Sequence, residues 1–150
     1  LAVDRERERL ARARLDDLHH RLKISPPLTC HRHHAIADAY VDPITSWPRV
    51  VLEGDEVVGF IRGNFDPGNT EEEFRSCVWR VNVSADQQGR GIGTFAVLAL
   101  ADEARTRGFD RLTAVWEVGD DGPDKFFRSM GFTVAGETQY GESFGVLSLA

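Results

Sequence analysis

Long hydrophobic runs are missing from this sequence of 150 residues, and so is any excess of positive charge. No apolar stretch approaches the ~20 residues that a membrane-spanning helix requires, and the opening LAVDRERERLARARL is too charged for the apolar centre of a secretory signal. We therefore expect a soluble, cytoplasmic protein without a membrane partner. The 18 Lys and Arg against 24 Asp and Glu give a formal net charge of −6, which argues against a nucleic-acid partner, because nucleic-acid-binding proteins usually present a basic face.

Cysteine is scarce as well, since only Cys30 and Cys77 are present and they form no CxxC pair. In the cytoplasm both would stay reduced, so we expect free thiols. A metal site is one interpretation of Cys30 together with His31, His33 and His34. Tetrahedral zinc sites usually separate paired ligands by two to four residues, whereas these residues are adjacent or nearly so. We therefore expect no metal, and place the histidines at the start of a helix or at the lip of a pocket.

Length and composition predict one α+β domain over residues 1–150, with one core. The hydrophobic periodicity predicts helices over residues 4–22, 29–40, 91–107 and 123–130. It predicts a hairpin over 49–65 around Gly54-Asp55, and strands over 76–84, 111–118, 132–136 and 144–149. Residues 66–73 are expected to form a solvated loop. In strand 76–84 the alternation predicts one face with Cys77, Trp79, Val81 and Val83, and the other with Val78, Arg80 and Asn82.

Three glycines, Gly89, Gly91 and Gly93, stand where strand 76–84 gives way to the predicted helix 91–107. The first N–H groups of a helix lack partners and its dipole favours an anion, while glycine removes the Cβ and permits positive φ. A pyrophosphate could therefore reach these amides directly. A dinucleotide fingerprint would need glycine where Thr94 stands, and a phosphate-binding Walker A loop would need Lys there. Neither motif matches, and a glycine-rich turn without a ligand stays open.

The loop resembles the Q/R-x-x-G-x-G/A motif of the GNAT superfamily of acyl-CoA-dependent N-acetyltransferases, written here as Gln88-Gly89-Arg90-Gly91-Ile92-Gly93. The resemblance covers nearly the whole chain, including the hairpin VVLEGDEVVGFIRG, the strand VWRVNVS and the closing FFRSMGF. It implies the GNAT acyl-CoA N-acyltransferase fold, a central mixed and mostly antiparallel sheet with a splayed central strand, flanked by helices. It also implies acetyl-CoA as co-substrate. The implied binding residues are Val81, Asn82, Val83, Gln88, Gly89, Arg90, Gly91, Ile92, Gly93, Thr94, Phe126 and Arg128.

Within the superfamily, the WR before the loop, FFRSMGF and the late GETQYGES resemble the diamine and spermine/spermidine acetyltransferase branch. This resemblance implies a polyamine or another small cationic amine as acceptor. Carboxylates expected around the acceptor would suit such a cation: Glu71, Glu72, Glu73, Glu117, Asp120, Asp121 and Glu142. Because an acidic protein scatters carboxylates over its surface anyway, an antibiotic, an amino acid and a peptide N-terminus remain open as acceptors.

Direct attack of an amine on the thioester needs a base for the ammonium proton and an acid for the departing thiolate. Glu117 and Glu142 are candidate bases, although each could be a surface or strand-end acid. The family's usual acid is a Tyr in F-Y-x-x-x-G-F, and Phe127 occupies that position here. Phe has no O–H to donate, so a water, Ser129 or another side chain must replace it, or catalysis is slow. An acyl-CoA-binding module with weak or no catalysis, and a structural domain that binds no CoA, therefore stay open as alternatives.

Members of the family commonly pair through their C-terminal strands, so the resemblance implies a homodimer. The final FGVLSLA places Val146, Leu147 and Leu149 in an apolar edge that a partner chain would cover. Trp47, Trp79 and Trp116 are expected in the core or in a pocket wall.

Overall fold

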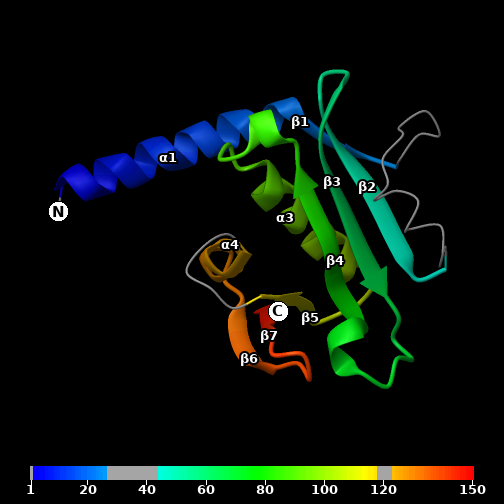
Figure 1. Cartoon of the computed structure of the whole chain (residues 1–150). Helices are drawn as coiled ribbons and strands as arrows, with labels where there is room; N and C mark the ends of the chain where they lie inside the picture. Colours follow the sequence, from blue (N-terminus) through cyan, green and yellow to red (C-terminus); the bar gives the residue numbers. More distant parts are fainter. Residues whose placement is uncertain (1, 27–43, 118–122) are drawn as a thin grey trace.

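A seven-stranded mixed sheet organises the protein in the computed structural model, which describes residues 2–26, 44–117 and 123–150 (Figure 1). Its strand order is β1-β2-β3-β4-β5-β7-β6. The strands are β1 (Leu22–Ser25), β2 (Ser46–Glu53), β3 (Glu56–Phe65), β4 (Ser76–Val83), β5 (Arg111–Trp116), β6 (Thr133–Glu137) and β7 (Ser143–Ser148). The helices are α1 (Ala2–Arg21), α3 (Ile92–Thr106) and α4 (Pro123–Ser129), with the short 3-10 turns η1 (Glu72–Phe74) and η2 (Ala85–Gln87). The predicted α+β fold class is thus confirmed.

Among the side chains of helix α1 that the structure describes, the buried one lies near the C-terminal end of the helix. Leu18 is buried in the core, whereas the described side chains of Arg5, Arg9 and Leu10 are exposed, and Leu10 keeps 48% of its surface. Figure 1 shows the first turns of the helix extending away from the sheet. No helix of the described segments is long and apolar enough to cross a membrane.

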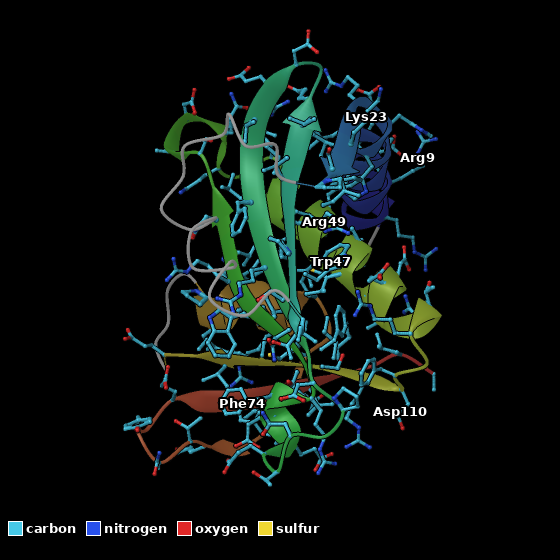
Figure 2. The ribbon with its side chains drawn as sticks, turned by 90° about the vertical axis from the view of Figure 1, so that its right-hand side faces the viewer. Arg9, Lys23, Trp47, Arg49, Phe74 and Asp110 are labelled. Atoms are coloured by element: carbon cyan, nitrogen blue, oxygen red, sulfur yellow. The ribbon has the colours of Figure 1, made fainter. Side chains whose placement is uncertain are left out.

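The start of the sheet differs from the sequence expectation. Leu22, predicted as the last helical residue, begins β1, and its backbone pairs with Glu53 at the end of β2. The predicted hairpin is confirmed as β2 and β3, which turn at Gly54, whose φ is +62°. The predicted helix over 29–40 lies outside the described residues. Figure 2 shows Trp47 and Arg49 side by side on β2, where the Arg49 guanidinium lies 4.4 Å from the centre of the Trp47 ring.

Helix α3 packs closely onto the central strands because β3 carries glycines under it. A Cβ built on Gly63 would lie 2.3 Å from Leu100 Cδ1, and one on Gly59 would lie 3.1 Å from Ile92 Cγ2. The helix buries its apolar side there, including Ala96, Val97 and Leu100. It ends as expected at Gly108, whose φ of +88° and N–H bond to the Arg105 carbonyl close the last turn. The close contact fixes the start of α3 beside β4.

The face alternation predicted for β4 is wrong beyond Val78. The ladder with β3 shifts there, since Arg62 pairs with Arg80 while the next residue, Gly63, pairs with Val78. Trp79 is thus the extra residue of a bulge, which reverses the side on which the following residues point. As a result Val78 lies on the same side as Val81 and Val83, packed with the core under α3.

The C-terminal strand is not an edge of the sheet. Strand β7 pairs with β5 on one side and with β6 on the other, so β6 is the edge strand at this end. Leu149, expected on an exposed edge, is buried in the core at 7% exposure. The apolar edge predicted for FGVLSLA is therefore wrong, because β6 already covers it.

Candidate functional site

The functional site begins where β4 and β5 separate. These parallel neighbours pair only at Cys77 with Thr113 and at Val78 with Ala114. Beyond Val78 β4 continues to Val83 without β5 beside it, so backbone groups on that edge have no ladder partner there. This is the splayed central strand that the sequence led us to expect.

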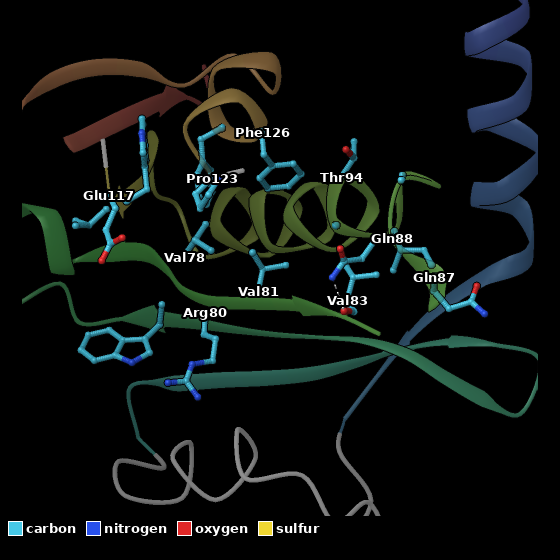
Figure 3. Close-up of a pocket in the computed structure, with 18 of the residues that line it drawn as sticks. Val78, Arg80, Val81, Val83, Gln87, Gln88, Thr94, Glu117, Pro123 and Phe126 are labelled. Carbon is cyan, nitrogen blue, oxygen red and sulfur yellow. Dashed lines mark hydrogen bonds between the residues drawn. The ribbon is translucent and has the colours of Figure 1, made fainter. Parts of the chain in front are cut away.

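A cavity of about 840 Å³ opens at this split. Figure 3 shows Gln87, Gln88 and Thr94 at one end, Glu117 and Pro123 at the other, and Val81 and Phe126 between them. The lining consists of Val78, Trp79, Arg80, Val81, Val83, Gln87, Gln88, Gly89, Gly91, Ile92, Gly93, Thr94, Val115, Trp116, Glu117, Pro123, Phe126, Phe127 and Glu142. The cavity is thus elongated, with the glycine loop at one end and two carboxylates at the other.

The glycine loop needs its glycines for two different reasons. Gly89 and Gly91 have φ values of +79° and +92°, in the left-handed region that L side chains rarely adopt. Gly93 instead gives space, because a Cβ there would lie 3.3 Å from the Phe126 ring. Gly91 is also the N-cap of α3 and provides no side-chain cap, so the first amides of the helix face the cavity without an acceptor from the cap residue.

This end of the cavity fits a diphosphate. The α3 dipole, the first-turn N–H groups and the absence of side chains at the glycines together favour an anion held by backbone amides. The apolar walls of Val81, Val83 and Phe126 continue from the loop toward the other end and suit a long, mostly uncharged arm. The residues present therefore fit a CoA thioester.

Strand register brings two glutamates to the opposite end of the cavity. Trp116, the last residue of β5, pairs with Ser143, the first of β7. Glu117 follows the one and Glu142 precedes the other, so both come to the same end of the ladder, and both line the cavity. The turn before Glu142 is fixed by the Thr138 N–H, which donates to the Glu142 carbonyl at 2.8 Å. Two adjacent negative charges favour a cation at this end.

Phe127 forms part of an aromatic wall and is almost fully buried, at 6% exposure. Its ring stacks on Trp116 with the centroids 5.0 Å apart and an interplanar angle of 20°. The Trp116 Nε1–H donates to Asp124 Oδ1 at 2.8 Å, and this bond is the main cause that lowers the pKa of the Asp124 carboxyl, followed by a bond from Arg128. The Ser129 hydroxyl donates to the Phe126 carbonyl at 2.7 Å, so it is engaged within its own helix.

Most of the residues expected to bind or react line this one cavity. Three do not: Asn82, Arg90 and Arg128 are outside the lining. Arg128 donates to Asp124, and Arg90 contacts Glu53 and Gln87. Among the other acids expected at the acceptor, Glu71, Glu72 and Glu73 do not line the cavity, and Glu72, the first residue of η1, pairs with Arg111. Asp120 and Asp121 lie outside the described residues. So do Cys30 and the neighbouring histidines, and the described segments hold no group of three side chains suited to a metal.

The sequence analysis missed several residues of the cavity as site residues. Val78 and Arg80 line it as well, and the bulge at Trp79, which no pattern in β4 announces, puts Val78 on the same side of the strand as Val81 and Val83. Trp116 was expected in the core or in a pocket wall. It belongs to both, because it is only 3% exposed and also lines the cavity. Gln87 adjoins the loop motif, and its position next to Gln88 was the available signal.

The chain is similar to known acetyltransferases. Residues 10–132 match the model of the Acetyltransferase (GNAT) family. The chain is 43% identical over 56 residues to the L-2,4-diaminobutyric acid acetyltransferase of Virgibacillus pantothenticus, covering 37% of this chain and 33% of that protein. It is 31% identical over 99 residues to the L-methionine sulfoximine/L-methionine sulfone acetyltransferase of Pseudomonas aeruginosa, covering 63% of this chain and 58% of that protein.

Solved structures of other proteins have the same fold. A GNAT family acetyltransferase from Elizabethkingia anophelis, solved with acetyl-CoA bound, superposes with a TM-score of 0.66 at 11% identity, over 85% of this chain and 98% of that one. The chain thus spans a third to somewhat over half of the length of the curated relatives it matches, and most of a solved structure with this fold. With the family model spanning 10–132 and the sheet splitting beside a glycine loop, the chain belongs to the acetyltransferase (GNAT) family.

Proposed function

We propose that this protein is an acetyl-CoA-dependent N-acetyltransferase that acts on a primary amine of a small acceptor. The observation that carries the proposal is the single cavity that joins the glycine loop at the start of α3 to the carboxylates of Glu117 and Glu142. A diphosphate fits the first end and a cationic amine the second. The splayed edge of β4 lies between them, where a thioester arm would extend.

The residues divide the work as follows. The amides from Gln88 to Thr94 hold the diphosphate, and the edge of β4 from Val81 to Val83 holds the arm, with Phe126 packed over it. Acetyl-CoA supplies an activated acyl group, and the acceptor amine attacks its carbonyl carbon directly while both substrates are bound. Amines with a pKa near that of Lys arrive protonated at neutral pH, so Glu117 or Glu142 accepts the proton, directly or through a water. The C–N bond forms, the C–S bond breaks and CoA leaves as its thiol or thiolate.

Protonation of the leaving thiolate is the step with no assigned residue. Phe127 has no hydroxyl, and the Ser129 hydroxyl donates to a backbone carbonyl rather than into the cavity. A free thiol has a pKa of about 8.5, so the thiolate is a tolerable leaving group even without an acid. The same substitution favours the second candidate function, an acyl-CoA-binding module with weak or no catalysis.

We propose that the acceptor is a small molecule with at least one positive charge beyond the reacting amine, of which a polyamine is one example. The paired carboxylates support a cation, and the relatives named above act on small amines, one of them a diamino acid. A monoamine amino acid, an aminoglycoside or a peptide N-terminus would use the same chemistry with weaker attraction to this end. The position of Glu117 and Glu142 therefore predicts a preference, in KM more than in kcat, for diamines.

Release of free CoA thiol from acetyl-CoA tests the function. We expect amine-dependent release with a panel of spermidine, putrescine, 2,4-diaminobutyrate, methionine sulfoximine, an aminoglycoside and a peptide, and fastest release with a diamine when each amine is supplied below its KM. Acetyl-CoA binding without release for any amine would support the binding module instead. No binding of acetyl-CoA would contradict both. Release that is fastest with a monoamine would refute the diamine preference alone.

We also propose cytoplasmic localisation and a homodimer, which rest on composition and family resemblance. The apolar edge that first suggested the dimer is covered by β6, so this edge does not support a dimer. Light scattering at tens of micromolar protein measures the mass directly, and a monomer mass would end the proposal.

A further inference from the structure

The arginine inside the glycine loop points away from the cavity that the loop lines. Gly89 and Gly91 both line that cavity, whereas Arg90 between them does not. The Arg90 side chain instead crosses to the β2–β3 hairpin. Its Nη2 donates to Glu53 Oε2 at 2.8 Å and its Nη1 donates to Glu53 Oε1 at 3.3 Å. The guanidinium and the carboxylate thus meet through two parallel bonds, the strongest form of this pair.

Both partners are held by other contacts. Arg90 Nη1 also donates to Gln87 Oε1, at the end of the short turn η2. Glu53 is the last residue of β2, and its backbone pairs with Leu22 in β1 and with Glu56 in β3. The pair is only partly exposed, with 33% of the Arg90 side chain and 26% of the Glu53 side chain accessible. The end of three strands is therefore tied to the middle of the glycine loop.

The charges at this contact cancel locally. The Arg90 guanidinium holds the pKa of the Glu53 carboxyl below its ordinary value, chiefly by donating hydrogen bonds to it. At neutral pH the carboxylate is ionised and neutralises the arginine, so this side chain adds little net positive charge to the cavity. Its contribution must then be geometric. Two positive-φ glycines flank it, and such a segment has many alternative conformations unless something holds it.

We propose that Glu53 is a positioning residue, which acts through Arg90 to hold the backbone amides of residues 88–94 in the conformation that binds the diphosphate of acetyl-CoA. The inference rests on the proposed function for its ligand, and on the contact of Glu53 with Arg90 for its mechanism. It assigns a role in co-substrate binding to a hairpin residue outside the cavity. It also makes the Arg90 side chain the anchor of the loop, while the Arg90 backbone amide stays among those that hold the diphosphate.

Binding of acetyl-CoA and of S-acetyl-pantetheine, which lacks the diphosphate, to four proteins tests this role. The proteins are the wild type, Glu53→Gln, Arg90→Gln and the double variant, and calorimetry gives each Kd. We expect each single variant to weaken acetyl-CoA binding about fivefold, the scale of a partly exposed ion pair, and the double variant to weaken it no further. S-acetyl-pantetheine should bind all four equally. Glu103→Gln is the matched control, because it breaks a similarly exposed pair between Glu103 on α3 and Arg107 just after the end of that helix, away from the loop.

Hydrogen exchange of the amides of residues 88–94, measured without ligand, gives a second readout. Exchange should speed up in both single variants and stay unchanged in Glu103→Gln. If wild-type protein binds no acetyl-CoA, the proposed function fails, and the exchange rates alone decide whether Glu53 positions the loop. Weaker acetyl-CoA binding in Arg90→Gln with unchanged or tighter binding in Glu53→Gln would overturn the proposal, because Arg90 would then contact the phosphates itself. Equal weakening of S-acetyl-pantetheine would also overturn it, as a general effect on the fold.

Discussion

Replacing Gly145 by alanine would push directly against the aromatic wall of the cavity. A Cβ at Gly145 would lie 2.2 Å from Trp116 Cη2 and 2.6 Å from Cζ3, distances that real Cβ atoms do not show. Trp116 cannot turn away cheaply, because it is 3% exposed, stacks on Phe127 and donates Nε1–H to Asp124. Inserting a methyl group into such a packed site typically costs about 1–3 kcal/mol. For a domain of this size, that predicts a fall in Tm of roughly 3–10 °C.

Urea and thermal unfolding of Gly145→Ala beside Gly136→Ala would measure this effect. Gly136 is the matched control, since it lies on the neighbouring strand β6 and a Cβ there would meet nothing within 4 Å. We expect Gly136→Ala to stay within about 0.5 kcal/mol of the wild type, as is usual for surface changes. A Gly145→Ala protein that is as stable as Gly136→Ala would refute the reasoning, since Trp116 would then not be confined as described.

Three further outcomes are expected. Gly91→Asp should abolish acetyl-CoA binding measured by calorimetry while the protein stays folded, because φ is +92° there and the carboxylate would stand beside the diphosphate; unchanged affinity would remove the phosphate-loop proposal. Phe127→Tyr should leave acetyl-CoA binding intact and keep or raise kcat, whereas a tenfold fall in turnover of a folded, CoA-bound variant would show that the apolar ring itself is required. Asp124→Asn should lower Tm relative to wild type near pH 7. This difference in Tm should shrink as pH falls below about 4, because a carboxyl whose pKa is lowered on folding stabilises the folded state only while it is ionised. A Tm difference that does not change with pH would contradict this.

Much of the fold could be predicted from local patterns in the sequence. The β2–β3 hairpin has its Gly54 turn between two β-branched runs, and the end of α3 has Gly108 at a position that requires positive φ. Such features depend on a few neighbouring residues, so sequence reasoning finds them. The glycine loop at the start of α3 was found for the same reason. The likeness to a known family supplied the splay of β4, which no local pattern encodes.

The misses depend on long-range contacts. Leu22 continues the helical pattern of α1 and still becomes a strand residue, because β2 offers it a ladder partner 31 positions away, at Glu53. The bulge at Trp79 reverses part of β4 without any glycine or proline to mark it. The end of the chain looks like an exposed apolar edge until β6 is placed beside it. The Glu53–Arg90 contact joins residues 37 positions apart and leaves no trace in either local motif.

The short ladder between β4 and β5 has a consequence for how the domain coheres. In the described part of the chain, the sheet has two halves, β1 to β4 and β5 with β7 and β6, and only two residue pairs join their edges. One further contact between the halves is a hydrogen bond from the Thr113 hydroxyl in β5, which donates to the Glu73 carbonyl in η1 at 2.6 Å. A co-substrate lying in the split would contact both halves of the sheet and hold them together while it is bound. The free energy of unfolding would then increase with the concentration of co-substrate, by about 2.7 kcal/mol at a concentration of 100 times Kd.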